Sequence, residues 1–129
     1  NANYICESLK GDYHLPFDTE YPLHESVFTD KLQKENGVQT LDIAKRLIDY
    51  GFHPPTTYFP IHIPGTLMIE PTETESKSAC DQFISAMKAV AREAKETPEI
   101  VKTAPQNTFR KRLDEVGAAR KPVLTWNDL

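Results

Sequence analysis

The chain lacks several features that would place it in a specialised class of protein. Its 129 residues carry 15 basic and 19 acidic side chains, so no positive field attracts a phosphate backbone or an anionic membrane. No apolar run approaches the roughly 18 residues that span a bilayer, and the first ten residues lack the basic-then-apolar order of a secretory signal. These absences predict a cytoplasmic protein without nucleic-acid or membrane partners.

Motifs that carry chemistry are equally scarce. The five glycines are isolated at turns or element ends, so the sequence contains no glycine-rich phosphate loop. The four histidines form no H-x-x-x-H pair and the two cysteines form no C-x-x-C, which predicts no metal site. Cys6 and Cys80 each lie in an apolar helical pattern, so we expect buried free thiols and no disulfide.

Helical periodicity is the strongest local signal. Apolar residues at helical spacing predict helices over residues 1–10, 40–50 and 73–96. We expect Thr40 to cap the second helix, and Thr72 with Glu75 to form a capping box for the third. Charged residues near these helices are interpreted as a solvated face (Asp42, Lys45, Arg46, Asp49) and as carboxylates that complement a helix dipole (Glu70, Glu73, Glu75).

Strand signals lie between the helices. Alternation after Pro22 predicts a strand over 23–29, and the apolar run over 66–70 predicts a central strand. Pro60 and Pro64 limit the intervening segment to an edge strand or irregular chain. The order of elements predicts a two-layer α+β domain over 1–104, with a small, mostly antiparallel sheet packed against helices, and an extended C-terminal tail over 105–129.

Longer sequence words are more specific than these patterns. NANY, His24-Glu25, GVQTLDIAKRLIDYG, YGFHPPTTYFP and GTLMIEPTETES together resemble the C-terminal part of the glycine dehydrogenase (decarboxylating) family, the P-proteins of the glycine cleavage system. The ending RLDEVGAARKPVLTW is similar to subunit 2 of the two-subunit bacterial form. The resemblance covers nearly the whole chain, and it implies the small domain of a fold type I pyridoxal-phosphate enzyme.

The resemblance also implies a reaction and its partners. Members of this oxidoreductase family release CO2 from glycine and pass the aminomethyl group to the lipoyl group of the H-protein, with subunit 1 as a further partner. The family's Schiff-base lysine lies in a large domain, which would precede Asn1. We therefore expect no catalytic and no cofactor-binding residue in this chain, no pyridoxal phosphate bound to it alone, and no activity without the remainder.

Four polar residues in the family-like words are candidates for a substrate cleft: His53, Thr56, His24 and Glu25. Pro54 holds His53 away from the helical region, so the loop is stiff, and we expect it to face the cleft, where an imidazole could position glycine's carboxylate or a lipoyl arm. The alternatives are that His53 only caps or packs the turn, and that strand alternation buries His24 beside the sheet with a backbone partner.

Two other functions remain open at this point. The chain could be a free-standing domain that binds an amino acid, or a subunit-assembly piece whose basic tail clasps a partner, because both share the same class of fold. The chain begins with Asn and with helix-like sequence, which favours a piece of a longer protein over a free-standing module.

Overall fold

A three-stranded antiparallel sheet forms one layer of the domain. The computed structural model describes residues 1–17 and 22–126. Strands β1 (Ser26–Thr29), β2 (Thr56–Thr57) and β3 (Thr66–Ile69) pair in the order β1-β3-β2. The central position of β3 and the short edge strand at β2 confirm the predicted arrangement of this part of the sheet.

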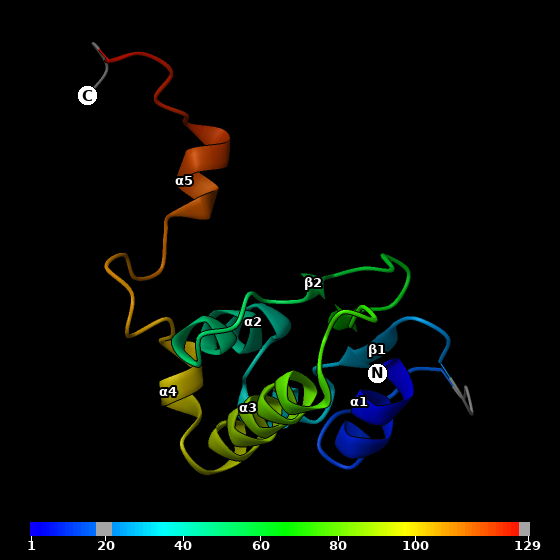
Figure 1. The fold of residues 1–129 in the computed structure, drawn as a ribbon. Helices are drawn as coiled ribbons and strands as arrows, with labels where there is room; N and C mark the ends of the chain where they lie inside the picture. Colours follow the sequence, from blue (N-terminus) through cyan, green and yellow to red (C-terminus); the bar gives the residue numbers. More distant parts are fainter. Residues whose placement is uncertain (18–21, 127–129) are drawn as a thin grey trace.

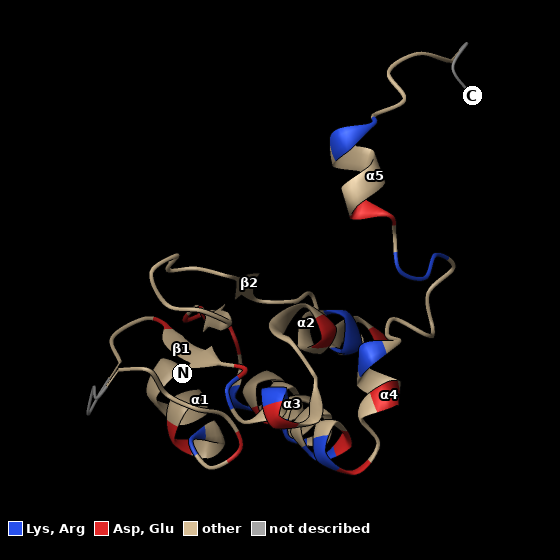
Figure 2. Cartoon of the chain, turned by 180° about the vertical axis from the view of Figure 1, so that it is seen from behind, with Lys and Arg blue, Asp and Glu red and all other residues tan. Residues whose placement is uncertain are grey.

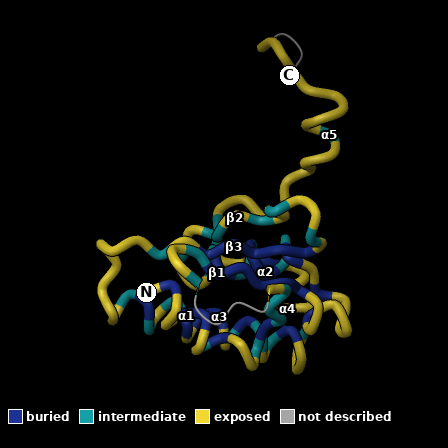
Figure 3. Tube along the Cα trace, turned by 90° about the vertical axis from the view of Figure 1, so that its right-hand side faces the viewer, coloured by how far each residue is buried: buried dark blue, intermediate teal, exposed yellow. Residues whose placement is uncertain are grey.

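Helices form the second layer. The helical elements are α1 (Ala2–Leu9), η1 (Gln33–Asn36), α2 (Thr40–Asp49), α3 (Lys77–Glu96), α4 (Pro98–Lys102) and α5 (Glu115–Arg120). Figures 1 and 3 show α1 and α3 lying against the sheet, while α5 lies away from the rest of the domain. The predicted two-layer α+β class is therefore confirmed. None of the helices in the described ranges is long and apolar enough to cross a membrane.

The core lies between the two layers. Phe28 and Leu67, which are paired across β1 and β3, are both fully buried. The ring of Tyr13 meets Phe28 edge-on at 6.1 Å, and its hydroxyl donates a hydrogen bond to the carbonyl of Met87 in α3 at 2.9 Å. This bond satisfies the one polar group of a large buried side chain, and burial raises the pKa of Tyr13, so it stays a neutral donor.

A buried junction joins the end of β1, the start of α2 and the start of β3. Asp30, 3% exposed, donates its backbone N–H to the carbonyl of Gly65 at 2.9 Å. Its carboxylate accepts the backbone N–H of Thr40 at 3.0 Å, and the Thr40 hydroxyl donates to the same Gly65 carbonyl at 2.7 Å. Three chain segments are thereby tied at one point by groups that have left water.

The predicted caps of two helices are wrong. Thr40 is the first residue of α2, and the cap is Gln39, which forms a capping box with Asp42. The Thr40 hydroxyl is committed to Gly65 in the buried junction, so it cannot cap its own helix. Helix α3 begins at Lys77, not at 73, because Ser76 accepts the N–H of Ala79 as the N-cap.

The first strand is shorter than predicted. Pairing starts at Ser26 with Ile69, so residues 23–25 lie outside β1, and Leu23 is 93% exposed. The next pair in this register would be Glu25 and Glu70, two like charges, and the following residue on the second strand, Pro71, has no N–H to donate. Repulsion and the missing donor both oppose extension of the ladder.

The segment after α4 packs on α2 before the chain leaves the domain. Asp49, predicted to face water, is 1% exposed in its side chain and accepts the backbone N–H groups of Gln106 and Asn107 at 2.7 Å each. Arg112 donates to the Asp42 carboxylate at 2.7 Å and to the Lys102 carbonyl at 3.0 Å. Contacts with the domain thus continue through Arg112, and Glu115 adds an ion pair with Lys45 at 3.3 Å.

Beyond this segment the tail is not extended throughout, because residues Glu115–Arg120 form α5, with Asp114 as its N-cap. The predicted division at residue 105 stays a prediction, and the last three tail residues lie outside the described part of the chain. Figure 2 shows the basic residues of the tail on both sides of this helix.

Substitution of Gly65 by Ala tests the junction. Gly65 has a φ of +70°, and a Cβ there would lie far inside van der Waals contact with the Asp30 carboxylate. We expect Gly65→Ala to lower the free energy of unfolding by at least about 3 kcal/mol, measured by urea denaturation. Gly37→Ala is the matched control, because Gly37 has a φ of +76° but open space around it, and it should cost only about 1–2 kcal/mol. Equal losses would contradict the role of the junction.

Asp49 makes the docking of residues 106–112 depend on pH. Burial by itself raises the pKa of Asp49, but the N–H groups of Asn107 and Gln106, together with Arg46, lower it overall. Because the folded-state pKa is the lower one, the stabilisation is present above the unfolded value near pH 4 and is lost as pH falls through the folded value.

We therefore expect Asp49→Asn to make stability depend less on pH below pH 4, as measured by thermal unfolding at a series of pH values. At pH 7 the same change should speed tryptic cleavage after Arg112 several-fold, because an amide offers one acceptor oxygen where the carboxylate offers two. Glu96→Gln, at an exposed position at the end of α3, is the control for lost charge. Cleavage at the unaltered rate would show that Asp49 does not hold the segment.

Candidate functional site

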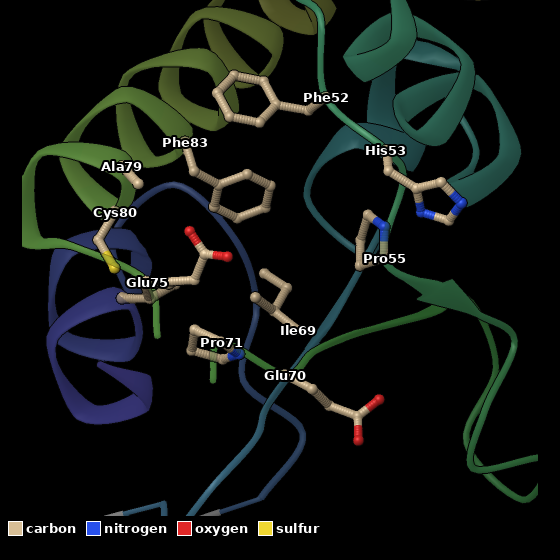
Figure 4. A pocket seen from close by; sticks show the side chains of 11 residues that line it. Phe52, His53, Pro55, Ile69, Glu70, Pro71, Glu75, Ala79, Cys80 and Phe83 are labelled. Carbon is tan, nitrogen blue, oxygen red and sulfur yellow. The ribbon is translucent and has the colours of Figure 1, made fainter. Parts of the chain in front are cut away.

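A cavity of about 390 Å³ lies between the loop after α2, the end of β3 and the start of α3. Phe52 and Phe83 form one wall, with ring centroids 5.4 Å apart in an edge-to-face arrangement. Figure 4 shows the Glu75 carboxylate directed toward the ring of Phe83, with the Ile69 side chain beside it. The complete lining is Ile5, Phe52, His53, Pro55, Ile69, Glu70, Pro71, Glu75, Ala79, Cys80 and Phe83. This first cavity therefore combines an apolar wall with carboxylates.

A second cavity, of about 570 Å³, adjoins the first and shares Glu70, Pro71 and Glu75 with it. It is further lined by Glu73 and His24. The sequence interpretation of the three glutamates as partners of a helix dipole is wrong, since α3 begins at Lys77 and has no acidic residue in its first turn. These residues line the cavities instead, and Figure 4 shows the Glu70 carboxylate directed away from Phe83 and Glu75.

One group of side chains has donor atoms suited to a metal ion. His24, Glu25 and Glu70 place an imidazole nitrogen and two carboxylate oxygens within 4.8 Å of one another. His24 Nε2 lies 3.6 Å from Glu25 Oε2, and the His24 side chain is 76% exposed. The prediction that alternation buries His24 beside the sheet is therefore wrong, because residue 24 precedes the first strand.

The loop after α2 separates the first cavity from a third, which measures about 510 Å³. His53 and Pro55 line both cavities, whereas Thr56 lines only the third. Gly51 ends α2 at a φ of +83°, and the two prolines then restrict the backbone. His53 Nδ1 lies 2.9 Å from the carbonyl of its own neighbour Pro54, so the ring is oriented locally and remains exposed.

The structure brings the sequence candidates into two groups. His53 and Thr56 share the third cavity, and His24 and Glu25 lie together at the start of β1. Glu70 connects the groups, because it lines the first cavity with His53 and lies within the His24–Glu25 cluster. Sequence reasoning missed Glu70 and the aromatic wall, although a glutamate directly after the central strand was a usable signal.

Other reactive groups of the domain are buried or paired. Cys6 and Cys80 are buried and free, as predicted, and burial, followed by the charge of Glu7, raises the pKa of the Cys6 thiol. Arg46 donates to both oxygens of Glu93 at 2.9 and 3.0 Å and holds the pKa of that carboxyl below its usual value. The Arg46–Glu93 pair is therefore not free to anchor a substrate carboxylate.

The architecture is that of a small α+β domain with a carboxylate-lined cleft. The family model described as "Glycine dehydrogenase, C-terminal domain" matches residues 1–112. The chain belongs to this family, as the resemblance in the sequence implied.

Relatives named as probable glycine dehydrogenase (decarboxylating) subunit 2 support the assignment. The protein from Bacillus licheniformis is 56% identical over 126 residues, which is 98% of this chain. The proteins from Halalkalibacterium halodurans and Staphylococcus haemolyticus are 54% and 55% identical over 129 residues, the whole of this chain. In each case the match covers 26% of the relative, so the chain spans about a quarter of the length of the curated relatives it matches.

Proposed function

We propose that this chain is the C-terminal domain of subunit 2 of a glycine decarboxylase, the P-protein of the glycine cleavage system. In this role it serves an enzyme that releases CO2 from glycine and transfers the aminomethyl group to the lipoyl group of the H-protein. The observation that carries the proposal is near-complete alignment, at 54–56% identity, with proteins of that printed name. That name also supports a partner, subunit 1 of the same enzyme.

The residues of the cavities do not fit pyridoxal phosphate. That cofactor is held through a lysine and a set of phosphate-binding groups, and it supplies an electron sink for the reaction. Within residues 1–17 and 22–126, no lysine or arginine lines the first or second cavity, and Lys45, which lines the third, pairs with Glu115 at 3.3 Å. We therefore place the cofactor and its lysine in the part of subunit 2 that lies outside this chain.

The part of the reaction left to this chain is to form a wall of the cleft. The stiff loop that carries His53 projects an exposed imidazole between two cavities, where it could hold a substrate group and exclude water. A wall of this kind orients the reacting group without taking part in bond breaking. His53 is accordingly proposed as a positioning residue, with Thr56 beside it.

An uncharged surface is proposed to adjoin the remainder of subunit 2. Residues 50–69 contain no Asp, Glu, Lys or Arg, as the uncoloured loop around β2 in Figure 2 shows. Within it Phe59 is 51% exposed and Ile61 is 87% exposed. Exposed apolar residues grouped on one loop are typical of a surface that is covered in the complete protein.

Addition of pyridoxal phosphate to this chain alone tests the division of labour. We expect no stoichiometric visible absorbance band, because the cavities offer neither a free lysine nor a cationic cradle for the phosphate. Borohydride reduction and mass spectrometry should find at most scattered labelling of surface lysines. A band assigned to one lysine at one equivalent would refute the placement of the cofactor outside this chain.

His53→Ala in the complete two-subunit enzyme tests the positioning role. We expect kcat/KM for glycine decarboxylation to fall by about tenfold or more, while the melting temperature changes by less than about 2 °C, because His53 is exposed and contacts its own neighbour. His62→Ala is the control, since His62 is also exposed and lines none of the three cavities. Unchanged kinetics in His53→Ala would make the residue a part of the turn only.

A further inference from the structure

We propose that the first cavity binds a primary alkylammonium group, that is, a protonated amine at the end of an aliphatic chain. The proposal goes beyond the proposed function and does not depend on it. It concerns the part of the first cavity formed by Glu75 and the aromatic wall, which lies beside the loop that carries His53.

Acidic side chains outnumber basic ones in the two adjoining cavities. Glu70 and Glu75 line both cavities, and Glu73 lines the second together with His24 and the N-terminal Asn1. Among the described residues, no lysine or arginine side chain lines either cavity. The carboxylates of Glu70 and Glu75 form no ion pair and no side-chain hydrogen bond with any residue in the described ranges 1–17 and 22–126. Carboxylates gathered without a cation attract one, and they repel an anionic ligand.

The surface beside these carboxylates is apolar. Phe52 and Phe83 form the wall, and Ile69, 5% exposed, forms part of the floor. Figure 4 shows the Glu75 carboxylate directed toward the ring of Phe83. An aliphatic chain would cover the apolar surface while its terminal ammonium meets the carboxylate, and an ammonium group near an aromatic face gains further attraction.

The shape and the donors favour an amine over a metal ion in this cavity. At about 390 Å³ the cavity is of the size that holds small organic ligands. The cluster with metal-ligand geometry needs His24 and Glu25, neither of which lines the first cavity, and a hydrated ion would leave the aromatic wall uncovered. A divalent cation at His24 is therefore the main competing result.

Titration of the chain with a matched set of six-carbon probes, followed by two-dimensional amide NMR, tests the proposal. We expect n-hexylammonium to shift the amides of Glu70, Glu75 and Ala79 saturably, at least tenfold more tightly than n-hexanol, and hexanoate to have no effect. Glu75→Gln should weaken the binding of hexylammonium at least fivefold and leave the binding of hexanol unchanged. Glu70→Gln should have a smaller effect, because the Glu70 carboxylate is directed away from Phe83. Glu96→Gln, at the other end of α3, is the charge control.

A further probe distinguishes the source of the amine. Nα-acetyl-lysine methylamide presents the same alkylammonium as a protein-borne side chain, so binding of this probe indicates a lysine of a partner, and its failure beside bound hexylammonium indicates a free or differently carried amine. Equal affinity for hexanol and hexylammonium would overturn the proposal, as would equal effects of Glu75→Gln and Glu96→Gln. So would a response to Zn²⁺ alone that His24→Ala abolishes.

Discussion

The buried contact of Asp30 with Thr40 and Gly65 fixes the geometry on which the rest of the domain depends. The start of α2 is held there, and α2 leads through Gly51 to His53. The start of β3 is held there too, and β3 leads directly to Glu70. Two walls of the first cavity therefore begin at one point. A displacement at this junction would be transmitted to both walls, through helix α2 and through strand β3. Its polar groups are buried together, so each needs the others as partners.

Local patterns in the sequence were sufficient to predict the helices and strands whose formation depends mainly on neighbouring residues. The helical stripe of α2, the central strand and the long helix α3 all lie where periodicity placed them, within a few residues. Polar residues were harder, because their environment is set by distant segments. Asp49 lies on a helix face whose sequence pattern is typical of solvent exposure, but Gln106 and Asn107, far along the chain, cover it. Thr40 resembles a cap, but its hydroxyl is used by Gly65.

The candidate functional site also combines features that depend on neighbouring residues with features that depend on distant segments. His53 was proposed from the family resemblance, and the prolines beside it predicted only that its loop is stiff. The grouping of Glu70 with His24, by contrast, depends on how β1 and β3 pair. A one-residue change of that register would send the side chains to opposite faces of the sheet. The charges of the cavities also bear on the proposed reaction, in which glycine loses its carboxylate and an amine remains. Among these groups, a cleft lined by Glu70 and Glu75 suits the amine.

The small size of α5 has a consequence for how this chain would be observed in solution. The helix has six residues and none of them is buried, and its Glu115 contacts the domain through Lys45. A helix of this length does not hold itself together in water, because nucleation costs more than so few hydrogen bonds return. The contribution of α5 to the circular-dichroism signal is therefore expected to change separately from the cooperative unfolding of the core. The exposed indole of Trp126, beyond this helix, is an intrinsic fluorophore that reports when another surface covers the arm.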